Sequence, residues 1–273
     1  MKQNSTKKLL STSLLLVLIA LVSLTAATTA WMTIADSTRL KTMRLDVTSG
    51  ANLRFDLDSH ETFEEYVKSL RLIDIADRIL RDQGYHPREN PLSPVTTTDC
   101  IHFTLENGEP AAKESYMEFV LHFMATDDMV VHLTTAGEEG TRIFSDEVSD
   151  IAKAMRISFT ADDSTAVYDP GMEPGSEEGL GGKIFGLARG NRIVYDTSNT
   201  LFFLKADVDK PVTVRIWLEG TDEICTDALR GVPYNIQLRF VGTDENGNLL
   251  EDSRTTTRRS AAATPTEERN ENK

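Results

Sequence analysis

The sequence predicts a mainly β protein: an antiparallel two-sheet sandwich of jelly-roll or immunoglobulin-like type, with one helical insertion near residues 60–83. Many short segments alternate apolar and polar residues, one segment has helical spacing, and no repeat has the period of a solenoid or a propeller. The chain has 273 residues, 40% of them hydrophobic, which is enough to bury a core. We therefore expect one sandwich domain over about 38–252.

The predicted strands are short, and most have a period of two residues. In 211–218, Val212, Val214 and Ile216 face one way while Thr213, Arg215 and Trp217 face the other. Such strands have one buried and one wetter face, as in an antiparallel sheet. The predicted strands are 41–47, 52–57, 101–105, 116–125, 129–134, 155–160, 165–168, 192–195, 201–206, 211–218 and 234–241.

The helical insertion is predicted from apolar residues that recur every three or four positions. Ser59 is the expected N-cap, and Gly84 and Pro87 are expected to end the helix. The recurring residues are Phe63, Tyr66, Val67, Leu70, Ile75, Ile79 and Leu80. The stretch 169–191 is rich in glycine and proline, and we expect a long surface loop there with a short strand at 183–187.

The N-terminus has the pattern of an export signal. Lys2, Lys7 and Lys8 precede an apolar run over 14–22, and small residues over 25–30 suit cleavage after Ala27 or Ala30. A second interpretation stays open, in which 9–30 remains as an uncleaved membrane anchor. Either interpretation predicts a secreted or cell-surface protein that touches the membrane only through this segment. Residues 253–273 lack large apolar side chains, so we expect a disordered tail.

Charge and motifs exclude several function classes. The formal charge is −14, and both ends are basic, so the body is more negative than the whole chain. Such a body repels phosphate backbones, and we expect no nucleic-acid partner. The sequence has no H-E-x-x-H motif and no G-x-S-x-G motif, so we predict no catalytic residues and no enzyme activity.

Few residues remain as candidates for metal binding. His122 and His132 lie ten residues apart on predicted neighbouring strands, but no third ligand is suitably spaced, so ordinary strand histidines are favoured. The segment 244–248 resembles part of a calcium loop, yet Asn246-Gly247 favours a plain turn. We predict no cofactor, and calcium at the acidic surface is left without a placed site.

Cys100, Cys225 and Trp217 each allow two interpretations. In an exported protein, Cys100 and Cys225 can form one disulfide, but their spacing does not decide whether they pair. Trp217 either stacks on a sugar or covers the core, and the core is favoured because tryptophan usually packs there in a sandwich of this size.

Two stretches resemble a known group of proteins. Lys7-Lys8-Leu9-Leu10 through Ala30-Trp31-Met32-Thr33 resembles the signal of Gram-positive proteins processed by the SipW-type signal peptidase. The segments 214–225 and 236–240 resemble the closing strands of TasA/camelysin-like secreted proteins. The resemblance implies a jelly-roll-like sandwich at the cell surface or in the matrix, where some relatives build biofilm fibres. Camelysin has been described as a metalloprotease, but this sequence has no zinc signature, so that activity is not transferred.

The leading hypothesis is an exported, non-enzymatic structural protein that associates with itself, such as a biofilm matrix subunit. Residues 31–47, with alternating Met43, Leu45 and Val47, would donate a strand to a neighbouring copy. Equally, these residues would form the first strand of their own sheet. The alternative function is a monomeric surface adhesin or carbohydrate-binding module that uses 169–191 or Trp217. A hydrolase with a site assembled from distant residues is a weaker third hypothesis.

Overall fold

The structure is a computed structural model of the chain, and it describes residues 40–48, 52–148, 150–226, 229 and 232–250. The predicted signal or anchor, the cleavage candidates Ala27 and Ala30, Trp31 and the tail 253–273 lie outside the described residues. Among the described helices, none combines the length and the apolar character that a membrane span requires.

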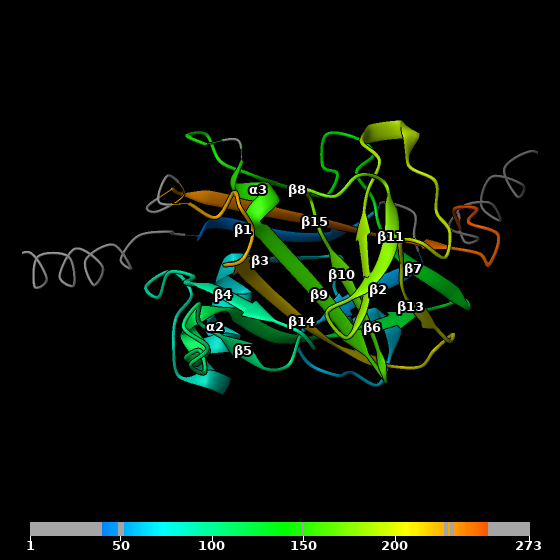
Figure 1. Cartoon of the computed structure of the whole chain (residues 1–273). Helices are drawn as coiled ribbons and strands as arrows, with labels where there is room; N and C mark the ends of the chain where they lie inside the picture. The colour runs from blue at the N-terminus through cyan, green and yellow to red at the C-terminus, as the bar shows by residue number, and fades with distance from the viewer. Residues whose placement is uncertain (1–39, 49–51, 149, 227–228, 230–231, 251–273) are drawn as a thin grey trace, which may run out of the picture.

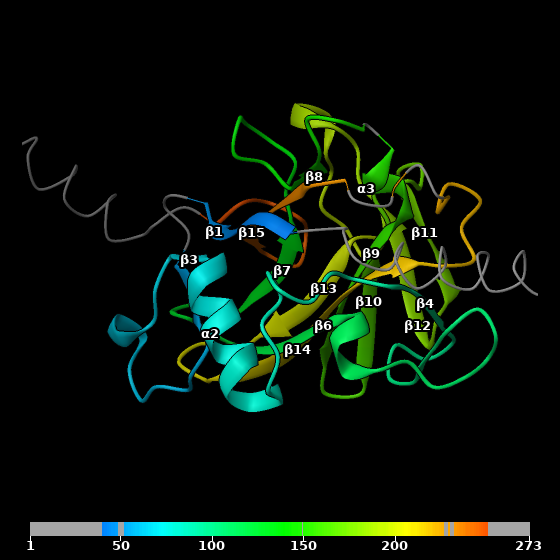
Figure 2. The same cartoon turned by 90° about the vertical axis from the view of Figure 1, so that its left-hand side faces the viewer.

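The strands lie in two layers, which confirms the predicted two-sheet sandwich (Figures 1 and 2). Sheet A runs β13 (Thr200–Leu204), β7 (Met129–Leu133), β15 (Tyr234–Thr243), β1 (Leu40–Val47) and β3 (Ser69–Arg71), and β8 (Arg142–Phe144) also pairs with β15. Sheet B runs β11 (Gly175–Gly179), β12 (Gly182–Gly186), β10 (Ser164–Tyr168), β9 (Met155–Ala161), β14 (Lys210–Glu219), β4 (Pro94–Thr97) and β5 (Phe103–Thr104). In sheet B, β6 (Met117–Ala125) pairs with β14 and with β2 (Leu53–Asp56).

The sheets are largely antiparallel, but three strand pairs are parallel. They are β1 with β15, β10 with β12, and β14 with β4. A sequence pattern of period two places each side chain on a face without fixing which strand lies beside it, so these parallel pairs were not predicted.

The core lies between the two sheets, where the predicted alternation places it. Val212, Val214 and Ile216 of β14 are fully buried in it. Phe240 of β15 stands near its centre, with its ring centroid 5.2 Å from that of Phe123 on β6. Aromatic side chains from both sheets thus meet in one cluster, and such pairs add to the stability that burial provides.

The helix is shorter than the sequence predicted. It is α2 (Leu72–Gln83), and the chain before it forms a 3₁₀ turn, η1 (Phe63–Glu65), followed by β3. Ser59 is therefore not the N-cap; Arg71 holds that position, and its backbone N–H donates to the Asp74 carboxylate at 3.0 Å. Residues 63–70 have helical spacing but form no α-helix: Val67 forms a bridge with Phe55, and Leu70 pairs with Leu45 of β1. Gly84 ends the helix with a φ of 84°, as predicted.

Further boundaries differ from the prediction. Residues 192–195 form no strand; η3 (Gly190–Arg192) and an irregular segment occupy that stretch. The short strand expected at 183–187 is present as β12, but it pairs with β11 in a hairpin within the stretch 169–191 predicted as a long loop, and the hairpin turn places Leu180 and Gly181 at positive φ. The strands β3, β4 and β8 have only three or four residues each, too few for a clear alternation.

Residues 40–47 belong to the protein's own sheet. As β1, they lie between β15 and β3, and Met43, Leu45 and Val47 are buried in the core. This pairing supports the alternative interpretation, in which residues 40–47 form the first strand of their own sheet. Residues 31–39 of the proposed donor lie outside the described residues.

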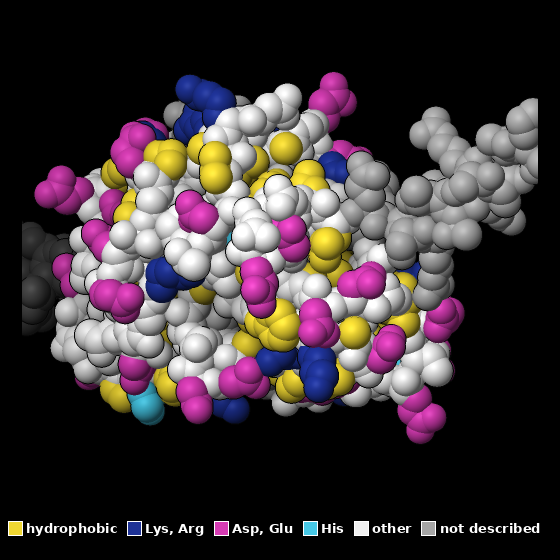
Figure 3. Space-filling view, turned by 90° about the vertical axis from the view of Figure 1, so that its right-hand side faces the viewer, with side chains coloured by type: hydrophobic (Ala, Val, Ile, Leu, Met, Phe, Trp, Pro, Cys, Tyr) yellow, Lys and Arg dark blue, Asp and Glu magenta, His cyan; other side chains and the backbone are white. Residues whose placement is uncertain are grey.

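The face drawn in Figure 3 has acidic side chains spread over it rather than gathered at one place. On the face drawn in Figure 3, they stand among small, separate apolar groups. Exposed large apolar side chains include Phe203 on β13 and Ile73 and Leu80 on α2. Scattered apolar side chains of this kind are normal for a protein surface.

Candidate functional site

The two candidate histidines do not meet. His122 is on β6 of sheet B, and His132 is on β7 of sheet A, and each has its own hydrogen-bond partners. Their spacing of ten residues suggested neighbouring strands, but the chain passes from one sheet to the other between them. A metal site shared by His122 and His132 is therefore wrong.

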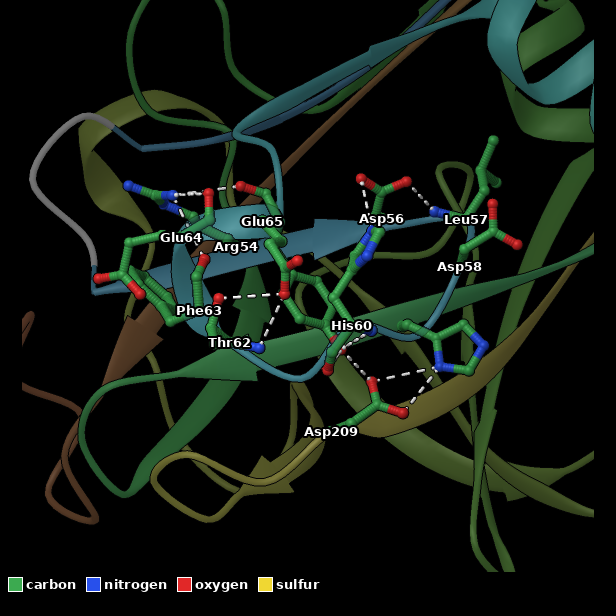
Figure 4. Close-up of polar contacts among 12 residues, drawn as sticks. Arg54, Asp56, Leu57, Asp58, His60, Thr62, Phe63, Glu64, Glu65 and Asp209 are labelled. Atoms are coloured by element: carbon green, nitrogen blue, oxygen red, sulfur yellow. Dashed lines mark hydrogen bonds and ion pairs between the residues drawn. The ribbon is translucent and has the colours of Figure 1, made fainter.

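A polar cluster surrounds Asp209, in the connection between β13 and β14 (Figure 4). The Asp209 carboxylate accepts hydrogen bonds from Tyr66 Oη at 2.8 Å and from Ser59 Oγ at 2.9 Å. His122 Nδ1 lies 2.9 Å from Asp209 Oδ2, and because both Asp209 oxygens are acceptors, Nδ1 carries the hydrogen. We call Asp209, His122, Tyr66 and Ser59 the Asp209 cluster.

The pKa of Asp209 reflects two opposing effects. Burial raises it, but hydrogen bonds from His122, Tyr66 and Ser59 outweigh burial, so the pKa lies below its ordinary value of 3.8. The pKa of Tyr66 is raised, first by burial. At neutral pH the cluster therefore contains a carboxylate anion and a neutral phenol.

A second group of contacts shapes the segment that carries Ser59 and Tyr66. Asp56 Oδ2 lies 3.3 Å from His60 Nε2, and the His60 ring meets the Tyr66 ring edge-on, with 5.0 Å between centroids. Arg54 of β2 donates to the backbone carbonyls of Phe63, Glu64 and Tyr66. Residues 57–66 are thus held across β2 and against the turn that contains Asp209 (Figure 4).

The arrangement fits a structural link better than a reaction centre. Ser59 and His122 both bond to Asp209 rather than to each other, so the cluster lacks the hydroxyl–imidazole contact that activates a nucleophile. Across the described ranges, no three His, Cys, Asp or Glu side chains are arranged to hold a metal ion.

Replacing Asp209 by alanine is expected to lower the free energy of unfolding by about 2 kcal/mol, because Tyr66, His122 and Ser59 lose a charged acceptor. Denaturant unfolding at pH 7 measures this change in the free energy of unfolding.

Asp163→Ala, at an exposed turn position, is the matched control and should change stability by less than about 0.5 kcal/mol. Because the folded pKa of Asp209 is lowered, the difference should be complete above about pH 5 and shrink as pH falls through that pKa. Equal losses in both variants would contradict the role given to Asp209.

Trp217 is fully buried on the outer side of sheet B. It packs with Val95, Cys100, Phe103 and Val167, and its Nε1 donates to Glu219 Oε2 at 3.0 Å. Trp217 is thus buried, as predicted, but in a second apolar cluster on the outer side of sheet B rather than in the core between the sheets. A fully buried indole cannot stack on a sugar, so Trp217 is excluded as a binding residue in the carbohydrate-binding alternative.

The cysteines lie against different groups of apolar residues. Cys100 is buried beside Trp217, and burial raises the pKa of its thiol to about 11, so it is a poor nucleophile at neutral pH. Cys225 is partly buried against the main core. The Cys100–Cys225 disulfide stays a prediction.

Residues 244–248 form the plain turn that the sequence favoured. The Asp244 carboxylate accepts from the backbone N–H groups of Asn246 and Asn248 and from Asn248 Nδ2. These bonds lower the pKa of Asp244. The Asp244 carboxylate is thus occupied by the turn itself.

Sequence reasoning missed a third polar group, at the start of 169–191. The Arg156 guanidinium on β9 lies 3.0 Å from the Asp169 carboxylate and 2.8 Å from the Asp222 carboxylate. All three side chains are mostly buried. Burial raises the pKa of Asp169, and the charge of Arg156 counteracts it in part. Like the Asp209 cluster, this group joins loops to a sheet.

No protein-family model, curated protein or solved structure matches the chain.

Proposed function

We propose that the protein is an exported, non-enzymatic structural component of a cell surface or extracellular matrix, which works by associating with further copies of itself. The N-terminal pattern and the resemblance to TasA/camelysin-like proteins support export and a matrix role. The polar groups around Asp209 and Arg156 support a scaffold, because each fastens loops to a sheet.

The observation that carries self-association is the open end of sheet B. Among the described strands, β11 pairs only with β12, so one edge of β11 is left to accept another strand. The edge is exposed, and Glu177 and Glu178 stand on it. Charged residues on an edge discourage pairing, so a strand that adds to β11 must place neutral or basic side chains beside Glu177 and Glu178.

The hairpin indicates which backbone groups face outward. Gly179 and Gly182 flank a two-residue turn, and such flanking residues form a hydrogen-bonded pair. Hydrogen-bonded and non-bonded pairs alternate along an antiparallel ladder, so Ser176 and Glu178 direct their N–H groups away from β12. Proline at position 176 would therefore block the free edge while keeping the hairpin bonds.

Light scattering of the purified chain at rising concentration tests the proposal. We expect its mass to grow into ordered assemblies, Ser176→Pro to suppress that growth, and the control Ser176→Ala to leave it unchanged. A persistent monomer in the unmodified chain would refute self-association and favour a monomeric surface-binding domain. Growth that Ser176→Pro leaves intact would keep the function and refute the β11 edge as its surface.

A further inference from the structure

His132 is a histidine buried on the outer face of sheet A. Only 1% of the residue is exposed, although its strand neighbours Val131 and Leu133 face the core on the other side of the sheet. Residues 193–199, between β12 and β13, lie over the imidazole, and the Tyr195 ring centroid is 5.3 Å from that of His132. We call residues 193–199 the covering segment.

The contacts of His132 Nδ1 fix its tautomer. Nδ1 lies 2.7 Å from Asn199 Oδ1 and 3.2 Å from the Asn199 backbone oxygen. Asn199 Nδ2 donates to the Val194 carbonyl at 2.7 Å, which identifies the other amide atom as the oxygen. Since Nδ1 faces only acceptors, neutral His132 carries its hydrogen on Nδ1.

The other imidazole nitrogen faces a shared hydroxyl. His132 Nε2 lies 3.2 Å from Thr243 Oγ1, and Thr243 Oγ1 lies 3.0 Å from the Asp244 carbonyl. Neutral Nε2 and that carbonyl compete for the single hydroxyl hydrogen. When Nε2 is protonated, it donates to Thr243 Oγ1, and the hydroxyl then donates to Asp244. Both N–H groups of the imidazolium therefore have acceptors. The free energy of protonating His132 in the closed form is set by its burial and by the nearby charges.

The charged groups around His132 come from three neighbouring segments. On β12, Lys183 Nζ donates to the carbonyls of Thr197 and Thr200 at 2.7 Å each. These residues flank Asn199 in the chain, so the positive charge of Lys183 lies close to the Asn199 side of the imidazole. In the covering segment, Asp196 favours the imidazolium, and the Tyr195 hydroxyl is neutral and donates to Thr134. The Asp244 carboxylate is occupied by its own turn.

We propose that His132 and the covering segment form an acid-released latch, in which protonation of His132 detaches residues 193–199 from the outer face of sheet A. Burial lowers the pKa of His132 below 6.5 in the closed form; the hydrogen bonds to Asn199 oppose this effect, and Lys183 adds a smaller lowering. A solvated imidazole in the open form has its ordinary pKa near 6.5. Closure is thus fully favoured above that pH. Below it, the open fraction increases by up to about tenfold per pH unit, until the pH reaches the lowered pKa.

Hydrogen exchange of the full chain tests the latch. After correction for the intrinsic pH dependence of exchange, the amides of 193–199 should open increasingly between pH 7.5 and 5.5, while those of β6 and β14 should not. In His132→Asn, the introduced amide can still donate toward Asn199 but takes up no proton, so its opening should not vary with pH. His122→Asn is the matched control and should keep the pH dependence of the unmodified chain.

Two results would overturn the latch: exchange in 193–199 that does not change with pH, or an equal pH dependence in His132→Asn. Should His132→Asn fail to fold, an NMR titration of His132 in the unmodified chain decides instead. The latch requires its pKa to lie below 6.5 and the Asn199 amide signals to shift with the same midpoint. Titration of His132 at or above 6.5 refutes it.

Discussion

Replacing Phe240 by alanine is expected to lower the free energy of unfolding by about 3–5 kcal/mol, the usual cost of removing a large aromatic ring from a core. Phe240 is fully buried, and its ring centroid lies 5.7 Å from that of Phe55 and 5.9 Å from that of Phe159. Phe240 belongs to sheet A and these rings to sheet B, so the space left by its ring lies between the sheets and cannot close without moving one sheet against the other.

Phe203→Ala is the matched control for Phe240→Ala. The two residues are of the same type and lie in the same sheet, but Phe203 is 46% exposed. Its replacement should cost less than about 1 kcal/mol, since little buried area is lost. Denaturant unfolding of both variants makes the comparison. A Phe240→Ala variant no less stable than Phe203→Ala would contradict the described core.

Replacing Arg156 by methionine should also cost about 3–5 kcal/mol, because two mostly buried carboxylates lose the cation that they share. Its guanidinium also donates to the Met155 carbonyl at 3.0 Å, so that carbonyl loses a hydrogen-bond donor as well. Without Arg156, burial and the charge of Asp222 raise the pKa of Asp169 further. A buried carboxyl whose folded pKa is raised destabilises the protein only while it is charged. The decrease in the free energy of unfolding caused by Arg156→Met should therefore shrink as pH falls through that pKa.

Two further variants separate charge from packing at Arg156. Lys153→Met removes an exposed cation that pairs with Asp150 at 2.8 Å, and it should cost less than about 1 kcal/mol. In the Arg156→Met background, Asp222→Asn should restore part of the stability, because one of the two uncompensated charges is removed. Thermal unfolding at pH 7 and pH 4 measures all four proteins. If neither low pH nor Asp222→Asn reduces the stability lost in Arg156→Met, the effect comes from packing alone.

The strands with clear alternation were the predictable part of the fold. In β14 and β15, large apolar residues recur at every second position, so the buried face follows from sequence alone. Residues 63–70 were misassigned because helical spacing also arises when a 3₁₀ turn precedes a short strand. The prediction of a strand at 192–195 was wrong because the backbone there pairs with no described strand, and the segment instead places the Tyr195 ring against His132.

The polar groups could not be predicted in the same way. Asp209 meets Tyr66 and His122, which are 143 and 87 residues away in the chain. No local spacing encodes such a contact, since it depends on which connection crosses which strand. Of these residues, only His122 was a candidate, and it was considered for a metal rather than for Asp209. Trp217 was assigned to the interior from its residue type alone, since the alternation placed it with Thr213 and Arg215 on the wetter face of the strand. It is buried there because other segments cover the outer side of sheet B.

The pairing of β1 with β15 affects how the protein can fold. These strands are neighbours in sheet A, yet Met43 is matched with Ile236, near opposite ends of the described chain. Any process that supplies the chain gradually from its N-terminus must hold β1 unpaired on that side until β15 arrives. Contacts so distant in sequence slow folding because the intervening chain must first be closed into a loop. We therefore expect sheet A to be completed last, after the hairpins of sheet B have formed.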